Sequence, residues 1–294
     1  MQFKRKPGWL KVKLPGDGEF RDVKRILKKY NLHTVCQEAR CPNLGECWGE
    51  GTATFMILGN ICTRHCKFCA TQTGNPRGAV DNDEPWRVAK AVKELNLKYV
   101  VLTSVTRDDL KDQGASIYAE TIRAIKSLNP GVRVEALTPD FYSNPEYIEM
   151  VLNSGLDVFA HNVETVRRLT PMVRDRRFSY EKSLEALKIA KTIRPDILTK
   201  SGFMVGLGET RDEIYETMKD LKEAGCEILT IGQYLQPTRK HLSVERYVTP
   251  EEFNEYKNLG LKMGFKFVAS GPLVRSSYRA GEIFALSFLD KSEK

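Results

Sequence analysis

Six of the seven cysteines lie in two groups of three, and all six fall between positions 36 and 69. Four and five residues separate the members of the first group, three and two those of the second. The first group is Cys36, Cys41 and Cys47, and the second is Cys62, Cys66 and Cys69. Two neighbouring thiol sets with different spacings predict two metal-ligand sets in one protein.

The second group, CTRHCKFC at 62–69, is tight enough for one loop to place three thiolates around an iron–sulfur cubane. A structural zinc site normally needs a fourth ligand, usually from a second C-x2-C pair, and no such pair follows Cys69. Three cysteines therefore predict a [4Fe-4S] cluster with one open iron. That iron can bind a small molecule through its amine and carboxylate groups, as S-adenosylmethionine binds.

The alternatives are buried apolar cysteines or the disulfides of a secreted protein. Disulfide scaffolds are usually short and rich in cysteine, whereas these cysteines are dispersed in 294 residues. The sequence starts MQFKRKPGWLKVK and shows no apolar signal segment there. We therefore expect reduced thiols and a cytoplasmic location. Cys226, in EAGCEI, is expected to fill the core.

The composition predicts an enzyme-sized globular chain, since 41% hydrophobic residues can bury a large core. No apolar run approaches the roughly 20 residues of a membrane span. The net charge of +8 resides near the N-terminus: residues 1–30 hold ten Lys/Arg and three Asp/Glu, against 36 and 35 in the remainder. This segment is either a solvated tail or a docking surface for an acidic partner. Nucleic acid is disfavoured because no aromatic stacking array accompanies the charge.

Short apolar runs alternate with amphipathic segments of helical length along the chain. Strands are predicted at 54–58, 99–103, 132–137, 156–161, 202–207 and 227–232, and helices at 86–96, 116–128, 183–193 and 213–224. Such β/α repetition predicts an α/β fold with a parallel sheet, either open and doubly wound or curved into a partial barrel. In both folds ligands bind at the carboxyl ends of the strands. The CTRHCKFC loop follows the first strand and is expected at that end.

The CxxxCxxC motif after the first strand resembles the radical S-adenosylmethionine superfamily, and the whole chain resembles its lipoyl synthase family. The quoted matches are CQEARCPNLGECW at 36–48, GTATFMILGNICTRHCKFCAT at 51–71, SVTRDDL at 104–110, HNVETV at 161–166, TKSGFMVGLGET at 199–210, QYLQPTRKHLSVERYVTPEEF at 233–253 and GPLVRSSYRA at 271–280. The first triplet separates this family from its relatives. Gln113 and Ser243 depart from the expected pattern, which places substrate contacts in question and not the chemistry.

The resemblance implies a partial (β/α)6 TIM-like barrel with N-terminal and C-terminal extensions. We expect an N-terminal extension with an auxiliary cluster motif at 1–50, the radical SAM barrel at 51–250 and a C-terminal closing segment at 251–294. It also implies two [4Fe-4S] clusters and S-adenosyl-L-methionine. Cys62, Cys66 and Cys69 would hold the cluster that cleaves this cofactor to a 5′-deoxyadenosyl radical, and Cys36, Cys41 and Cys47 the cluster sacrificed to insert sulfur at C6 and C8 of an octanoyl chain.

In this family a serine of the RSSY motif is the weak fourth ligand of the sacrificial cluster. The motif here is 275–278; we favour Ser276 and keep Ser277 open. Without the resemblance, this pair would be interpreted as a loop or a helix cap. Expected contacts to S-adenosylmethionine are Phe68, Ser104, Asn162, Glu164, Gly206 and Glu209. Phe68 is equally compatible with the core, and glycines at strand ends are common in turns.

The implied substrates are octanoylated lipoyl carrier domains or the glycine-cleavage H protein, and the implied electron donor is a ferredoxin or flavodoxin. We expect neither nucleic acid nor membrane as a partner. One alternative is another radical enzyme that inserts sulfur or a methylthio group. A second is a non-catalytic iron–sulfur redox sensor that binds nucleic acid through the basic N-terminus.

Overall fold

The computed structural model describes residues 5–12, 18–282 and 284, and its centre is an eight-stranded sheet. The sheet order is β1 (His33–Thr34), β2 (Thr54–Ile57), β5 (Tyr99–Ser104), β6 (Arg133–Leu137), β7 (Val158–Ala160), β8 (Leu198–Val205), β9 (Ile228–Gln233) and β10 (Phe267–Gly271). Neighbouring strands from β2 to β10 are parallel, and β1 pairs antiparallel with β2. A separate parallel pair joins β3 (Ile61–Cys62) to β4 (Gln72–Thr73).

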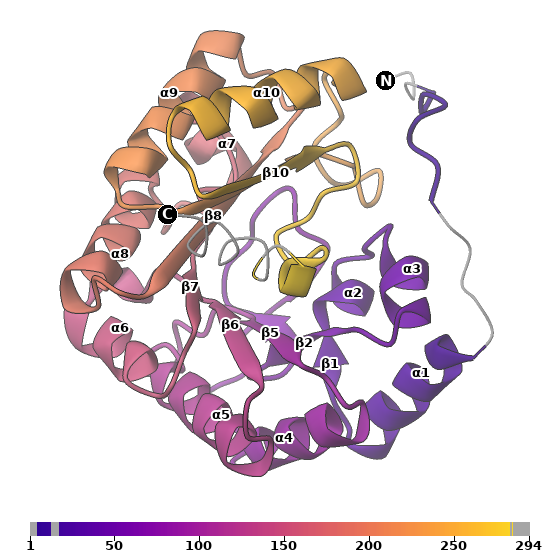
Figure 1. Cartoon of the computed structure of the whole chain (residues 1–294), viewed down its shortest axis with the longest axis vertical. Coiled ribbons are helices and arrows are strands. Elements are labelled where there is room, and N and C mark those ends of the chain that lie inside the picture. Colours follow the sequence, from indigo (N-terminus) through magenta and orange to yellow (C-terminus); the bar gives the residue numbers. More distant parts are fainter. Residues whose placement is uncertain (1–4, 13–17, 283, 285–294) are drawn as a thin grey trace, which may run out of the picture.

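The strands form a curved arc, and helices cover its outer side (Figure 1). These helices are α4 (Glu84–Glu94), α5 (Ala115–Leu128), α6 (Pro145–Leu152), α8 (Tyr180–Ile193), α9 (Arg211–Glu223) and α10 (Pro250–Lys262). Helices α9 and α10 start with capping boxes, in which the hydroxyls of Thr210 and Thr249 accept hydrogen bonds from the amides of Glu213 and Glu252, respectively. Between η1 (Phe141–Ser143) and α8, the chain also forms η2 (Arg167–Leu169) and α7 (Thr170–Val173).

The predicted partial barrel is confirmed, because all six predicted strands are mutually parallel in one sheet that curves into an arc (Figure 1). The sheet is larger than expected: β10 adds a further parallel strand beside β9, in register from Phe267 opposite Ile228. Strand β8 begins at Leu198, before the predicted position 202. Apolar residues dominate the strand interiors, as in β2, where all four residues are buried.

The N-terminal and C-terminal segments lie beside the opening between the first and last strands. Figure 1 shows α1 (Glu19–Lys29), α2 (Val35–Glu38) and α3 (Leu44–Gly49) on this side, near the segment that follows β10. The Asn43 side-chain amide donates to the Leu273 carbonyl over 2.7 Å and joins the two ends of the chain. Parts of the expected extensions, at 1–4, 13–17, 283 and 285–294, lie outside the described residues.

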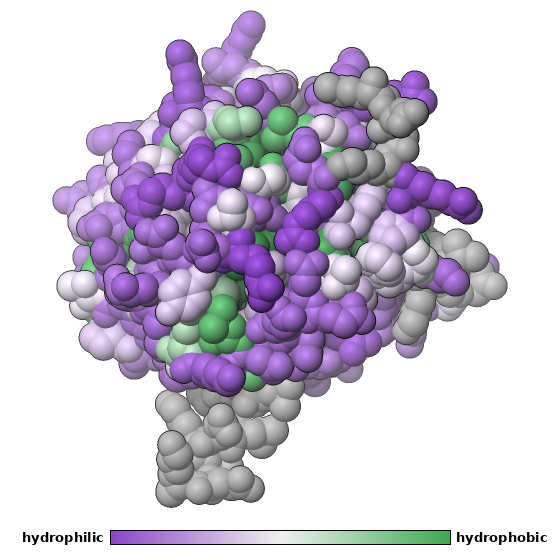
Figure 2. Space-filling model, turned by 90° about the horizontal axis from the view of Figure 1, so that it is seen from above, coloured by the Kyte–Doolittle hydropathy of each residue, from purple (hydrophilic) through white to green (hydrophobic). Residues whose placement is uncertain are grey.

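The surface is mainly hydrophilic on the face seen in Figure 2, with hydrophobic residues in small patches. Large exposed hydrophobic side chains belong to separate elements, among them Trp86 in α4 and Tyr215 in α9. Within the described part of the chain, no helix has the length and apolar character needed to cross a membrane.

Candidate functional site

A cavity of about 640 Å³ is lined by residues of β2, β5, β6, β8 and β9 and of the loops that follow β2, β5, β6, β7 and β9, together with residues from both chain ends. Its lining includes all six clustered cysteines and both serines of the 275–278 motif. The cavity lies where parallel strands end, as predicted for the ligand site of this fold. The structure thus brings together groups that are far apart in the sequence.

The loop of the second cysteine group begins at β3 and is held from three sides. The Thr63 amide donates to the Thr106 carbonyl after β5, and the Lys67 amide donates to the Val173 carbonyl at the end of α7. On the third side, His241 Nε2 donates to the Cys69 carbonyl over 2.9 Å. These contacts fix the loop before any ligand binds.

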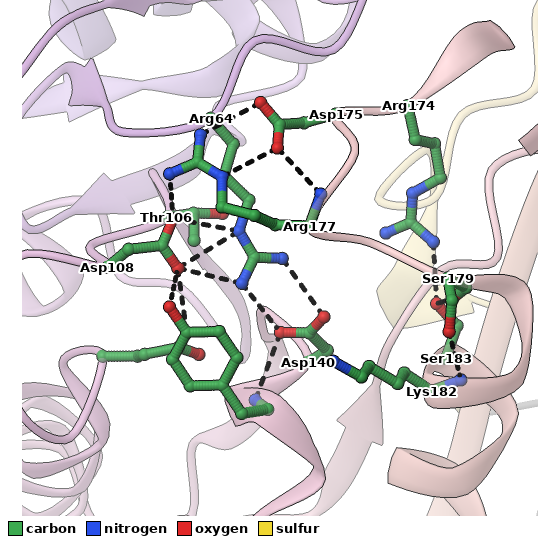
Figure 3. Close-up of polar contacts among 12 residues, drawn as sticks. Arg64, Thr106, Asp108, Asp140, Arg174, Asp175, Arg177, Ser179, Lys182 and Ser183 are labelled. Carbon is green, nitrogen blue, oxygen red and sulfur yellow. Dashed lines mark hydrogen bonds and ion pairs between the residues drawn. The ribbon is translucent and has the colours of Figure 1, made fainter. Parts of the chain in front are cut away.

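A buried charge network anchors the same loop (Figure 3). Arg64, between Cys62 and Cys66, is 2% exposed and pairs with Asp108 over 2.9 Å and with Asp140 over 3.1 Å. Its guanidinium also stacks on Phe178, 3.9 Å from the ring centre. Arg177 donates to Asp108, to Asp175 and to the Thr63 carbonyl. A buried cation with two carboxylate partners is costly to disturb, so this network holds the loop in one conformation.

The first cysteine group is built on two short helices. Cys36 lies in α2, whose first turn is capped by the Thr34 hydroxyl, and Cys47 lies in α3. Between them the Cys41 amide donates to the Cys36 carbonyl over 3.0 Å, which turns the chain back toward α2. Three thiols on this compact unit therefore face the common cavity.

All seven cysteines are free, and burial raises the pKa of Cys36, Cys41 and Cys69. Burial raises the pKa of Cys47 to about 12, with a further contribution from the charges of Cys36 and Cys41. Burial likewise raises the pKa of Cys66 to about 12. Among the described residues, no group of His, Cys, Asp or Glu has the arrangement that holds a single metal ion. Two sets of three free thiols fit the chemistry of larger iron–sulfur clusters, whose positively charged iron atoms stabilise thiolate ligands.

Four of the six residues expected to contact S-adenosylmethionine line the cavity: Phe68, Ser104, Asn162 and Glu164. Glu164 has a positive φ of 66°, accepts a hydrogen bond from Asn162 over 3.2 Å and has its pKa raised by burial. The other two, Gly206 and Glu209, are not among the lining residues. Glu209 instead accepts the amides of Gly206 and Leu207, and a Cβ at Gly206 would lie 2.5 Å from the Arg246 carbonyl. These cofactor contacts stay predictions.

Sequence reasoning missed Arg174, which lies in the cavity wall and is 5% exposed. Its Nη1 donates to Ser183 over 2.7 Å, and its guanidinium packs on Phe178 opposite Arg64. Its Nε, which is buried, has no hydrogen-bond partner. Arg107, which follows β5, is bound to Asp109 and to the backbone carbonyls of Leu58 and Ala79.

His161 also lines the cavity, and it is 2% exposed. Its Nδ1 donates a hydrogen bond to the Thr138 carbonyl over 2.9 Å. Its Nε2 is buried without a partner. A polar ligand in this cavity would satisfy such atoms, so the lining fits a cofactor with amine, carboxylate and hydroxyl groups.

The Ser276 hydroxyl donates to Asn162 Oδ1 over 3.3 Å, across 114 residues of sequence. Ser277 also lines the cavity. The C-terminal segment therefore reaches the expected cofactor residues and the first cysteine group at once. Which serine would bind iron stays a prediction.

Known proteins match the sequence of nearly the whole chain. The radical SAM superfamily profile matches residues 56–221, and the profile of the N-terminal domain of lipoyl synthase matches residues 1–41. The lipoyl synthase of Ectopseudomonas mendocina is 59% identical over 282 residues, which is 96% of this chain and 81% of that protein. The lipoyl synthase of Thermus thermophilus is 59% identical over 279 residues, which is 95% of this chain and 86% of that protein.

The chain belongs to the lipoyl synthase family. Membership in the lipoyl synthase family makes it a radical SAM enzyme that uses S-adenosylmethionine and [4Fe-4S] clusters, an auxiliary cluster among them. Lipoyl synthases act on lipoyl carrier domains. The resemblance stated from the motifs is thereby confirmed.

Solved structures support the fold of this lipoyl synthase family member. The FeFe-hydrogenase maturase HydG from Carboxydothermus hydrogenoformans superposes with a TM-score of 0.57 at 15% identity, covering 81% of this chain and 65% of that one. Methylornithine synthase superposes with a TM-score of 0.52 at 14% identity, covering 90% and 85%. At these identities the likeness concerns the partial barrel alone.

Proposed function

We propose that this chain inserts two sulfur atoms, at C6 and C8, into an octanoyl group carried on a protein lysine. The observation that carries the proposal is that both cysteine groups and the 275–278 serines line one cavity. Groups that would hold a radical-generating cluster and groups that would hold a sulfur-donating cluster therefore border the same space, where one substrate chain could meet both. When bound, the clusters and S-adenosylmethionine supply the carbon radical that removes hydrogen from an alkane and the sulfur atoms that replace it.

Cys62, Cys66 and Cys69 would hold the radical-generating cluster. The support is the rigid loop: Arg64 occupies a buried position between two of the ligands, and the surrounding backbone contacts fix the third. Phe68, Ser104, Asn162 and Glu164 would orient S-adenosylmethionine from the neighbouring wall of the cavity. Arg174 is the added candidate, since its buried cation favours a carboxylate in this wall. Gly206 and Glu209 would affect cofactor binding at most indirectly, through the backbone turn that the Glu209 carboxylate stabilises.

Cys36, Cys41 and Cys47, with Ser276, would hold the auxiliary cluster. An alkoxide is a harder ligand than a thiolate and is displaced more easily from iron in a sulfide cluster. Such a ligand suits a cluster that is dismantled during turnover. We propose 1–50 as the unit that carries this cluster, 51–250 as the barrel and 251–294 as the closing segment.

The preferred substrates would be octanoylated lipoyl carrier domains or the glycine-cleavage H protein, and a ferredoxin or flavodoxin would deliver the electron. Lys6 and Arg40 are exposed residues that also line the cavity, so positive charge lies at its entrance. An acidic carrier would be attracted to that entrance. Because the cysteines are free and clusters of this kind require reduced thiols, we place the protein in the cytoplasm.

The test is an anaerobic assay of the reconstituted protein with S-adenosylmethionine, dithionite and an octanoyl-lysine peptide. Mass spectrometry should detect a peptide that carries two added sulfur atoms, together with 5′-deoxyadenosine and methionine. Cofactor cleavage with a methylthiolated product would support the alternative radical enzyme instead. Failure of cleavage by a protein with both clusters loaded, combined with salt-sensitive nucleic-acid binding, would favour the redox sensor.

A further inference from the structure

The segment that follows β10 is fastened to helix α3 at two separated points. At one end, the Asn43 amide donates to the Leu273 carbonyl over 2.7 Å, and Asn43 is 2% exposed. At the other end, the Tyr278 hydroxyl donates to Glu46 over 3.0 Å. Arg279 donates to the same carboxylate oxygen over 3.4 Å. Asn43 is the N-cap residue of α3 and Glu46 belongs to its first turn.

Both serines lie between these two fastening points. The Tyr278 amide donates to the Arg275 carbonyl over 3.0 Å, so Ser276 and Ser277 are the two central residues of a four-residue turn. The residue before the turn packs closely against β9, because a Cβ at Gly232 would lie 2.1 Å from the Val274 carbonyl oxygen. The positions of the two serine hydroxyls therefore depend on the contacts that Tyr278 and Arg279 make with Glu46.

Glu46 links the serine turn to the first cysteine group. It directly precedes Cys47, and its side chain is 12% exposed. A carboxylate that accepts two hydrogen bonds from one segment makes stronger contacts than neutral partners would. The thiol group and the serine turn are thus attached to the same helical turn.

We propose that Glu46 is a positioning residue that holds the 275–278 turn, and with it the serine ligand, against the first cysteine group. This inference rests on the proposed function, because that function gives the serine its role. It predicts that the serine is released from the cluster more often when the Glu46 contacts are lost. The carboxylate itself touches neither substrate nor cluster in this assignment.

The experiment compares Glu46→Ala and Tyr278→Phe with wild type and with Glu282→Ala. Glu282 is an exposed residue that also pairs with Arg279, over 3.7 Å, outside the α3 contact, so it is a matched control. The first readout is hydrogen exchange of the 272–282 peptide in cluster-loaded protein. Loss of a hydrogen bond to a charged group should raise its exchange rate about tenfold in the two test variants and leave the control unchanged. The second readout is the rate of iron release to a chelator, which should rise in parallel.

Glu46→Gln keeps an acceptor for Tyr278 and should recover most of the wild-type exchange rate. Tyr278→Phe removes one oxygen atom and tests the contact even if Glu46→Ala fails to fold. Wild-type exchange and iron release in Tyr278→Phe would overturn the proposal, as would equal effects in Glu282→Ala. Both readouts are independent of turnover: absence of dithiolated product in the wild type would refute the proposed function and leave these measurements interpretable.

Discussion

The amide of Asp175 donates a hydrogen bond to the sulfur of Cys66 over 3.3 Å, although 109 residues separate them in the sequence. The Asp175 carboxylate accepts from the His65 amide over 2.8 Å, one residue before this cysteine. Arg177 pairs with the carboxylate and lowers the pKa of Asp175. The segment after α7 therefore clamps the central cysteine of the second group from two directions. An amide donor to a sulfur ligand also tunes the reduction potential of an iron–sulfur cluster.

Replacing Asp175 by Ala should loosen this clamp. We expect lower iron content at the second site and roughly tenfold slower cofactor cleavage, since the carboxylate loses its hydrogen bonds from the His65 amide and from Arg177, while the backbone amide of residue 175 can still donate to Cys66. The measurement is iron and sulfide per chain together with 5′-deoxyadenosine formation. Asp196→Ala is the control, because Asp196 forms a similar pair with Arg194 at an exposed position away from the cavity. Equal losses in the two variants would mean that the effect is general destabilisation.

The two cysteine groups should separate in their effects on the reaction. We expect Cys66→Ala to abolish 5′-deoxyadenosine formation, whereas Cys41→Ala keeps it and yields no dithiolated product. The physical reason is that the groups occupy different structural units, a loop after β2 and the helices α2 and α3. Cleavage lost equally in both variants, with the remaining cluster intact, would contradict separate roles.

The strands of the barrel could be predicted because their signal is local. Buried parallel strands are apolar runs, and the six predicted runs all became strands. Strand β10 escaped because most of FVASG is only partly buried and its end is small and polar. Helix α6 escaped because it is short, although Pro145 follows an Asn144 cap and marks its start. Helix α10 carried a capping box at Thr249 that pattern reasoning did not use.

The site could be predicted only where a motif identified it. The cysteine spacing indicated both thiol groups, and the family resemblance indicated the serines. Arg174 carries no local signal, because its importance comes from burial beside Phe178 and Ser183. The Arg64 network was equally hidden, since its partner Asp140 is 76 residues away and only the folded barrel brings them together. Long-range pairing of charges follows from tertiary structure and not from composition.

His161 should make the stability of the cluster-free protein depend on pH. Burial, aided by the charge of Arg174, lowers its pKa from 6.5 to about 4. Below pH 6.5 this histidine takes up a proton in the unfolded chain and not in the folded chain. Its contribution to the free energy of unfolding is therefore complete above pH 6.5 and is lost as the pH drops toward 4. Between pH 7.5 and 5.5 this uptake lowers the free energy of unfolding by about 1 kcal/mol. His161→Asn keeps an amide near the position of Nδ1. In denaturant titrations, its free energy of unfolding should fall less between the two pH values than that of the wild type. Identical losses would show that His161 does not titrate in this way.

Charge at the cavity entrance should matter for a whole carrier protein and not for a short peptide. We expect Lys6→Glu with Arg40→Glu to slow turnover of an octanoylated carrier at low salt, and the difference to shrink as salt rises, because the screening length is about 10 Å at 0.1 M. Lys90→Glu is the control, since Lys90 is exposed on α4 and does not line the cavity. Deleting the N-terminus through Lys13, which itself lies outside the described residues, should act in the same direction. If peptide and carrier slow equally, these residues contribute to structure and not to docking.

The serine ligand gives the sharpest test of the auxiliary cluster. Ser276→Ala should leave a cluster on three thiolates and keep cofactor cleavage, while sulfur transfer fails. Ser276→Cys should give a cluster that forms but releases sulfur poorly, because thiolate binds iron in such clusters more strongly than alkoxide. The measurement is dithiolated product per auxiliary cluster, with the same two substitutions at Ser277 alongside. Since both serines line the cavity, a defect confined to the Ser277 variants would move the ligand by one residue. Full dithiolation by both Ser276 variants and both Ser277 variants would remove serine from the cluster altogether.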